Sequence, residues 1–312
     1  MNTKTHKEAP AADLREDPTK GQELAPRTQT ATGLATVDFG DDAGAGMENI
    51  DSSEIKVPFL NILQSNSPQC KPVEAGGLAG ATMGKMMNGG TSEMFAGKEG
   101  VVFIPVWRNH NFVEFTPRLL GGGFVAIHQP DDPLILQLQA KYGKFGRLPN
   151  GVTKRDEQGQ AMDGTEITET FYLYGLILDT YGMTQRVIVP FKSSQIKKYQ
   201  AFMQRQMNIK YANPKGTDEN PLPPIQPPLW AHRWRLGTAF EKGKKGEYYG
   251  WTLSLAAKND DGTEKPPVES LIQMSNPLYA EGRAFHAMLK SGTAKADYKT
   301  DKAGALDEEV PF

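Results

Sequence analysis

The sequence predicts a β-rich α+β fold, an antiparallel sheet or barrel with two or three helices and disordered termini. Two observations lead to this prediction. Short runs of aromatic and β-branched residues recur from residue 101 to residue 256, separated by Gly, Pro, Asn and Asp. Apolar residues at helical spacing are confined to a few segments, two of which begin at a proline.

Seven segments are expected to form strands. They are Val101–Trp107, Phe112–Thr116, Phe124–His128, Thr168–Asp179 and Arg186–Phe191, followed by a hairpin of Trp230–Phe240 with Glu247–Ala256. Pro105 cannot donate a ladder hydrogen bond, so the first strand is expected at a sheet edge or at a bulge. The Gly- and Met-rich stretch from Ala75 to Gly100 is expected to be irregular loop.

Three segments are expected to be helical. Two of them, Pro133–Tyr142 and Pro277–Leu289, begin with proline, which is favoured at the first helical position. Ser193 is expected to cap the third helix, whose apolar stripe consists of Ile196, Tyr199, Met203 and Gln206 or Met207. The basic residues of this helix then lie nearer solvent.

Charge is unevenly distributed along the 312 residues. Residues 1–54 carry 5 Lys/Arg against 11 Asp/Glu, and residues 301–312 carry one Lys against four acids. Subtracting these net charges of −6 and −3 from the formal total of −2 leaves +7 for residues 55–300. The expected organisation is a disordered acidic extension, a folded domain, a flexible linker and an acidic tail, at 1–54, 55–290, 291–306 and 307–312.

Basic and aromatic residues are interleaved between Thr180 and Leu255. No Asp or Glu occurs from Thr180 to Thr217, a span with seven Lys and Arg residues. Cations attract phosphates while rings stack on unpaired bases, so this composition predicts a surface for nucleic acid. The candidate residues are Arg186, Lys192, Lys197, Lys198, Arg205, Arg233, Arg235, Lys242, Lys244, Lys245 and Tyr248. The alternative is a helix and hairpin that are merely basic outside and aromatic inside.

Alternation along the hairpin refines this prediction. It places Trp234 and Trp251 with leucines on one face, where they are expected to be buried. Arg233, Arg235 and Tyr248 then face outward and are the better candidates for ligand contact, whereas the lysines at the tip could equally belong to a solvated turn.

The sequence offers no catalytic motif, and neither enzyme activity nor a cofactor is expected. Gly80–Met86 approaches a phosphate-binding loop, but its glycine spacing is one residue short and Met86 stands where a hydroxyl is needed. The five histidines lack metal-ligand spacing, and Cys70 is the only cysteine, which excludes an intrachain disulfide and a Cys-based zinc site. With no apolar leader and no run of the ~18 apolar residues of a membrane helix, a cytoplasmic location is expected.

The last six residues are an acidic run closed by a hydrophobe, a proline and a terminal phenylalanine: Asp307, Glu308, Glu309, Val310, Pro311 and Phe312. This tail resembles that of bacterial single-stranded DNA-binding proteins, and the body is similar to larger phage-encoded proteins of the same role. The resemblance implies that the tail binds replication partners and that the body is a five-stranded barrel of oligonucleotide-binding (OB) type. The long N-terminal extension and the Gly/Met-rich loop depart from a minimal barrel.

Three functions remain open at this stage. The first is a non-catalytic protein that coats single-stranded DNA and recruits replication or recombination partners. The second is a single-stranded DNA-binding transcription cofactor that recruits a phage RNA polymerase. The third is an enzyme or virion component that merely binds acidic surfaces. Oligomerisation is possible in each case.

Overall fold

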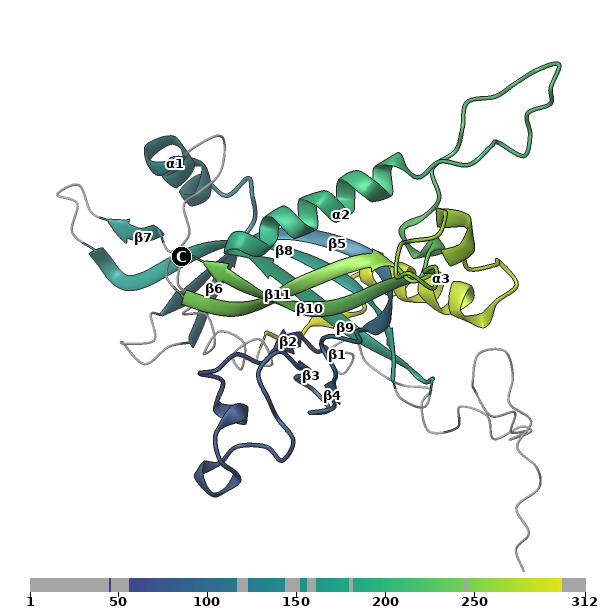
Figure 1. Cartoon of the computed structure of the whole chain (residues 1–312). Helices are drawn as coiled ribbons and strands as arrows, with labels where there is room; N and C mark the ends of the chain where they lie inside the picture. Colours follow the sequence, from purple (N-terminus) through teal and green to yellow (C-terminus); the bar gives the residue numbers. More distant parts are fainter. Residues whose placement is uncertain are drawn as a thin grey trace, which may run out of the picture.

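A computed structural model describes residue 45 and residues 56–116, 123–143, 152–155, 161–179, 182–243 and 246–298. In these parts the fold is α+β and rich in antiparallel strands, with three α-helices (Figure 1), as predicted. The predicted acidic tail and nearly all of the N-terminal extension lie outside the described residues. Within the described chain, no helix is long and apolar enough to span a bilayer.

A seven-stranded antiparallel sheet forms the body. Its strands are β5 (Val101–Thr116), β6 (Gly123–His128), β7 (Val152–Arg155), β8 (Ala161–Leu178), β9 (Thr184–Lys192), β10 (Trp234–Gly243) and β11 (Gly246–Leu255). The long strands β5 and β8 pair at the centre. At one end of this pair, β10 pairs with β5 and carries β11, and β9 pairs with β8. At the other end, β6 pairs with β5 and β7 pairs with β8.

The two strands predicted at 101–107 and 112–116 are one strand, β5, which pairs with β8 at the centre of the sheet. The predicted bulge is confirmed, since the register with β8 shifts between Pro105 and Trp107. Pro105 lies opposite Gly175, where an added Cβ would come within 2.3 Å of the Phe103 ring. On its other side β5 pairs with β10 only as far as Phe103 and with β6 only from Phe112. Residues 104–111, the open stretch of β5, therefore face no strand of the described chain on that side.

The stretch expected to be irregular loop contains two short strands. β3 (Met86–Asn88) pairs with β2 (Leu60–Ile62) and with β4 (Met94–Phe95) in a three-stranded sheet. Met86 and Met87 are buried. Because unbranched methionine fills irregular space in a core, it supports these strands without giving the β-branched pattern from which strands are predicted.

The folded region continues past the boundary predicted at residue 290. β12 (Lys295–Ala296) pairs in parallel with β1 (Lys56–Val57), and Ala294 is buried. Tyr298 packs against Phe59 and Phe124.

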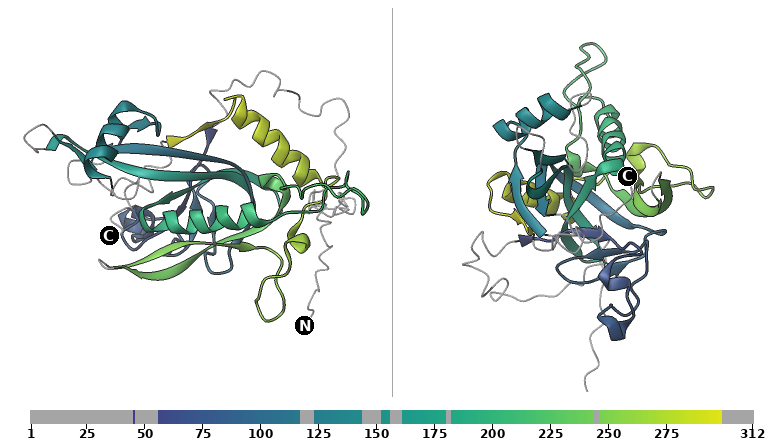
Figure 2. Two further views of the ribbon diagram at one scale, coloured as in Figure 1. Left: turned by 90° about the horizontal axis from the view of Figure 1, so that it is seen from above. Right: turned by 90° about the vertical axis from the view of Figure 1, so that its left-hand side faces the viewer.

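The three helices cover the sheet (Figure 2). α1 (Pro133–Tyr142) and α3 (Pro277–Lys290) begin as predicted, capped by the side chains of Asp132 and Asn276. α2 (Ile196–Asn208) follows a 3-10 turn, Ser193–Gln195. The prediction that Ser193 caps α2 is wrong, because Gln195 occupies the N-cap position of α2 and Ser193 begins the preceding 3-10 turn, at a left-handed φ of 51°.

Alternating side chains of the sheet enter two cores. Leu173 and Ile177 of β8 share one core with α2 and with the hairpin, in which Trp234 and Trp251 are buried as predicted. Tyr172 and Leu176 face the other core, which α3 closes. The alternation that period-2 side-chain geometry requires thus gives a sheet covered on both faces.

The free edge of β11 is covered by side chains rather than by another strand. The backbone N–H groups of Tyr249, Trp251 and Leu255 donate to side-chain oxygens of Gln64, Gln195 and Glu264. The indole N–H of Trp251 donates to the Pro190 carbonyl of β9 at 2.9 Å. In the described part of the chain no ladder joins β11 to β9, so the sheet curls without closing into a barrel.

Candidate nucleic-acid interface

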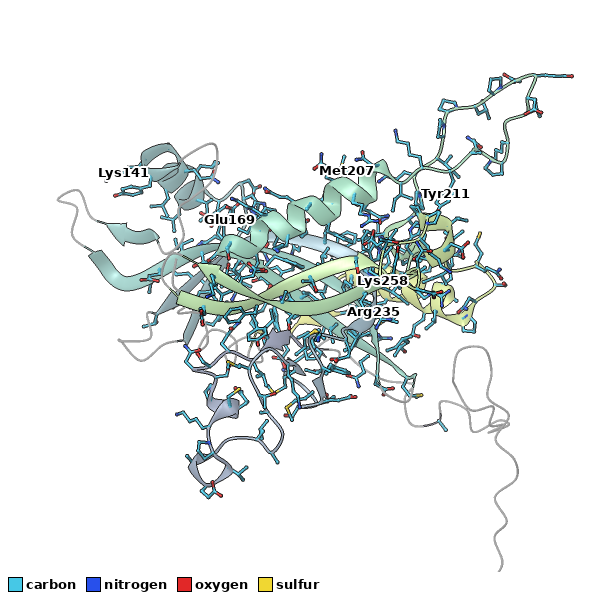
Figure 3. All side chains as sticks on the ribbon, in the orientation of Figure 1. Lys141, Glu169, Met207, Tyr211, Arg235 and Lys258 are labelled. Atoms are coloured by element: carbon cyan, nitrogen blue, oxygen red, sulfur yellow. The ribbon has the colours of Figure 1, made fainter. Side chains whose placement is uncertain are left out.

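The outer face of α2 is polar and carries no carboxylate. Lys197 and Lys198 are exposed on its first turn, and Lys210 is exposed just beyond its end. Met207 points away from the sheet (Figure 3) and is 59% exposed, so it does not belong to the apolar stripe. Phe202 and Gln206 take the buried positions.

The start of α2 meets the far end of the β10–β11 hairpin at one carboxylate. The Lys198 ammonium forms an ion pair with Glu241, with Nζ 3.1 Å from Oε1. The Tyr248 hydroxyl donates to the other oxygen of Glu241 at 2.9 Å and lies 3.0 Å from Ser194 Oγ. Burial raises the pKa of Tyr248, so it stays a neutral donor. These four residues form the α2–hairpin junction, which joins Lys198 and Tyr248 of the predicted set.

Arg205 lies further along α2, where it packs against a ring and pairs with a carboxylate. Its guanidinium carbon lies 5.7 Å from the centroid of the Trp234 ring, and it forms an ion pair with Glu264. Burial acts to raise the pKa of Glu264, but the hydrogen bond and charge of Arg205 outweigh it and lower that pKa. Much of the charge of Arg205 is therefore neutralised within the fold.

The other predicted cations have contacts of their own, and among those described here only Lys242 adjoins the junction, as the residue after Glu241. Arg186 lies over the Phe285 ring at 5.4 Å, and buried Lys192 lies 4.9 Å from the Phe115 centroid. Arg235 donates to the Glu99 and Gly100 carbonyls, and Lys242 pairs with Glu247 at 3.1 Å. Arg233 is half-buried. Lys244, Lys245 and the predicted acidic tail lie outside the described residues.

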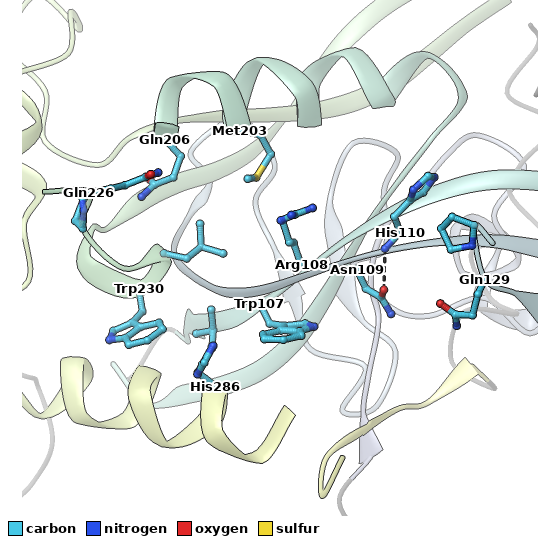
Figure 4. Close-up of a pocket in the computed structure, with 14 residues that line it drawn as sticks. Trp107, Arg108, Asn109, His110, Gln129, Met203, Gln206, Gln226, Trp230 and His286 are labelled. Carbon is cyan, nitrogen blue, oxygen red and sulfur yellow. Dashed lines mark hydrogen bonds between the residues drawn. The ribbon is translucent and has the colours of Figure 1, made fainter. Parts of the chain in front are cut away.

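A pocket of about 640 Å³ lies beneath α2 at the open stretch of β5 (Figure 4). α2 borders it on one side and α3 on the other, with β5 between them. The lining residues are Val106, Trp107, Arg108, Asn109, His110, Gln129, Pro130, Met203, Gln206, Gln226, Pro227, Leu229, Trp230 and His286. The lining combines aromatic rings, side-chain amides and one arginine, and it contains no carboxylate.

A stack of rings connects β5, β8 and α2 beside this pocket. His110 stacks on Phe171 with centroids 4.1 Å apart, and Phe171 stacks on Tyr199 at 4.7 Å. Burial raises the pKa of Tyr199 although Arg108 hydrogen-bonds to its hydroxyl. The His110 Nε2 atom lies 3.1 Å from Glu169. The stack fixes this wall of the pocket and holds Arg108 at its rim.

Two polar groups in the pocket lining lack a hydrogen-bond partner. Gln206 is 2% exposed, and neither its amide oxygen nor its amide nitrogen is bonded. The indole N–H of Trp230 is also buried and unbonded. The pocket could not be predicted as a site from the sequence, in which one signal points to it: Gln206 occupies a position on the apolar stripe of α2, where an amide has no packing role.

Among the described residues, no group of three His, Cys, Asp or Glu side chains is arranged to hold a metal ion. No curated protein matches the chain, and no solved structure does. The family model of the Pam3 phage gp34-like proteins matches residues 27–295 and supports a phage origin. This match spans most of the 312 residues, and the chain therefore belongs to the Pam3 phage gp34-like protein family.

Proposed function

We propose that this chain is a non-catalytic single-stranded DNA-binding protein that coats exposed strands and recruits replication or recombination partners through its acidic tail. One observation carries the proposal: the exposed face of α2 presents cations and amides without a carboxylate, directly above a pocket lined by aromatic rings. This pairing of charge and rings is what an unpaired strand requires, since its phosphates and its bases are both accessible.

In this proposal the phosphates meet Lys197, Lys198 and the hairpin turn, while bases stack on rings at ~1–3 kcal/mol per base. Phosphate attraction is blind to sequence and falls with salt. Arg186, Lys192 and Arg205 stabilise the fold through their ring contacts and contribute less to the strand.

The OB-like fold is part of the proposal. Strands β5, β8, β9, β10 and β11 supply five strands, and α2 stands between the third and the fourth. Pairing runs from β9 through β8, β5 and β10 to β11, and the Trp251–Pro190 hydrogen bond lies where a barrel would close. OB folds bind strands at the turn between strands 4 and 5, which here carries Lys242 and is followed by Tyr248.

The tail has a separate role. Asp307–Phe312 carries three acidic residues, and its sign matches that of DNA, so tail and strand compete for the same cations. The Phe312 ring would bind an apolar pocket on a partner, and the acidic residues before it would meet a basic rim.

The test measures fluorescence anisotropy of a labelled oligonucleotide, single- or double-stranded, across a salt series. It uses the full chain and a variant without residues 307–312. We expect preference for the single strand, a log–log salt slope of about −0.7 per phosphate neutralised, and unchanged or higher affinity without the tail. Equal binding to duplex would refute the proposal. A pull-down with and without the tail identifies replication enzymes or an RNA polymerase as the partner, and the latter result would favour the transcription role.

A further inference from the structure

The pocket beneath α2 contains polar groups that the fold itself leaves unsatisfied. Gln206 points its amide into the pocket from α2 (Figure 4), with an exposure of only 2% and no partner for either amide atom. A buried amide without hydrogen bonds destabilises the folded state, so such a residue needs a reason other than stability. A side chain with a donor beside an acceptor suits a ligand with the complementary pair.

The same pocket offers flat rings. His286 lies between two indoles, with centroids 5.3 Å from Trp107 and 4.8 Å from Trp230. Burial, with the nearby charge of Lys290, lowers the pKa of His286, so this ring is neutral at pH 7. The aromatic wall is therefore uncharged and suits a heteroaromatic ring better than a sugar or a lipid chain.

Charge at the rim indicates an anionic neighbour. Arg108 is exposed and hydrogen-bonds to Tyr199, and no carboxylate of the described residues pairs with it. Guanidinium groups bind phosphate through paired N–H groups. A volume of about 640 Å³ is sufficient for a nucleotide. From Lys198 to Gln206 the helix rises by about 12 Å, a span that a few nucleotides of extended strand can cover.

We propose that this pocket takes one unpaired nucleobase of the bound strand, with the base edge on the Gln206 amide, its ring against the indoles and its phosphate at Arg108. The inference rests on the proposed function, because the strand delivers the base. A glutamine amide matches adenine through N6 and N7, so adenine is the preferred base.

The experiment uses the full chain and two variants. Gln206→Leu removes the amide and keeps the volume, and Gln273→Leu makes the same exchange at an exposed position outside the pocket. Binding is measured by anisotropy with oligo(dA), oligo(dT) and an abasic strand of equal length. Free dAMP is tested by tryptophan fluorescence, and thermal melting reports folding.

We expect Gln206→Leu to weaken oligo(dA) binding about tenfold, the size of one bidentate base contact. Binding to the abasic strand should not change, and the melting temperature should rise by roughly 2–4 °C because a buried unpaired amide has been removed. Gln273→Leu should match the unmodified chain. In the unmodified chain, dAMP should bind far more weakly than oligo(dA).

Each contrary result has a distinct meaning. If Gln206→Leu melts higher but binds oligo(dA) as the unmodified chain does, the pocket is a hydrated structural cavity and the inference is wrong, while the proposed function stands. An equal loss on the abasic strand also overturns it. If the unmodified chain binds dAMP tightly and no oligonucleotide, the ligand is a free nucleotide and both the proposed function and the strand-delivered base are rejected.

Discussion

Lys198 of α2 and Glu241 of β10 form an ion pair across the α2–hairpin junction, with Nζ 3.1 Å from Oε1. The same carboxylate accepts the Tyr248 hydroxyl. Glu241 therefore binds two groups that the sequence predicts as DNA contacts, and under the proposed function it competes with a phosphate for them.

Replacing this carboxylate should strengthen DNA binding. Glu241→Gln frees the Lys198 ammonium and removes a negative charge near the strand, so affinity should rise about threefold at moderate salt, which corresponds to a partly exposed ion pair. Anisotropy with labelled oligo(dT) measures the change. Glu74→Gln, the same exchange at an exposed residue of the 3-10 turn Val73–Ala75, should leave affinity unchanged. A loss of affinity in Glu241→Gln would mean that Glu241 positions the site rather than competing for it.

The salt dependence should reside on the first turn of α2. Replacing Lys197 and Lys198 together by Ala removes two exposed cations, so the log–log salt slope should flatten by about 1.4, or 0.7 for each phosphate contact. The matched control replaces Lys56 and Lys71, which are exposed near the three-stranded sheet, and should keep the slope. An unchanged slope in the α2 variant would place the DNA on another surface.

Acid should destabilise the fold through His232. This side chain is fully buried, its Nε2 lies 2.7 Å from the Tyr211 hydroxyl, and burial lowers its pKa to about 4. Below pH ~6.5 the unfolded chain binds a proton at this histidine while the folded chain does not. The free energy of unfolding therefore decreases as the pH is lowered from 6.5 to 4. His232 should account for about 2–3 kcal/mol of the loss between pH 7 and pH 4. Denaturant unfolding of His232→Phe and of the unmodified chain at pH 7 and pH 4 measures this loss of free energy. An equal pH dependence in the two proteins would assign the loss to other groups.

The centre of the sheet should not tolerate a methyl group at Gly175. A Cβ there would lie 2.3 Å from the Phe103 ring and 2.5 Å from the Ile104 carbonyl oxygen. The carbonyl oxygen belongs to the backbone and cannot move aside as a flexible side chain can. Gly175→Ala should therefore lower the free energy of unfolding by about 2–3 kcal/mol, the usual cost of overpacking a strand core. The control Gly80→Ala tests an open position with φ 77°, where only conformational strain of about 1 kcal/mol is expected. A smaller loss at Gly175 than at Gly80 would contradict the packing described for β5 and β8.

Local signals predicted the starts of α1 and α3, whereas the pairing of the strands depends on contacts between distant residues. Asp132 and Asn276 each precede a proline, so α1 and α3 could be placed from adjacent residues alone. Pro105 correctly indicated a bulge, but the partner of β5 could not be predicted, because β5 pairs with β8 residues about seventy positions away. The strand β3 could not be predicted, because its methionines fill space in the core without the β-branched pattern that is typical of a strand.

The candidate site divides in the same way. Alternation along the hairpin placed the indoles of Trp234 and Trp251 inside and Tyr248 outside, while the helical period of α2 placed Lys198 near solvent. Tyr248 and Lys198 do come together, at Glu241. These patterns could not predict that Arg205 is paired with Glu264, nor that Trp107 and His286 share a pocket. Such contacts join segments remote in sequence, and only the folded chain determines them.

The covered edge of β11 has a consequence for crowding. Under the proposed function, copies of the protein would lie next to one another on a strand at high local concentration. An exposed row of backbone donors would then favour edge-to-edge strand pairing and aggregation. Gln64, Gln195 and Glu264 occupy that row. Under the proposed function, neighbouring molecules on this side would then contact one another through side chains alone, so that the coat could be removed from the DNA again.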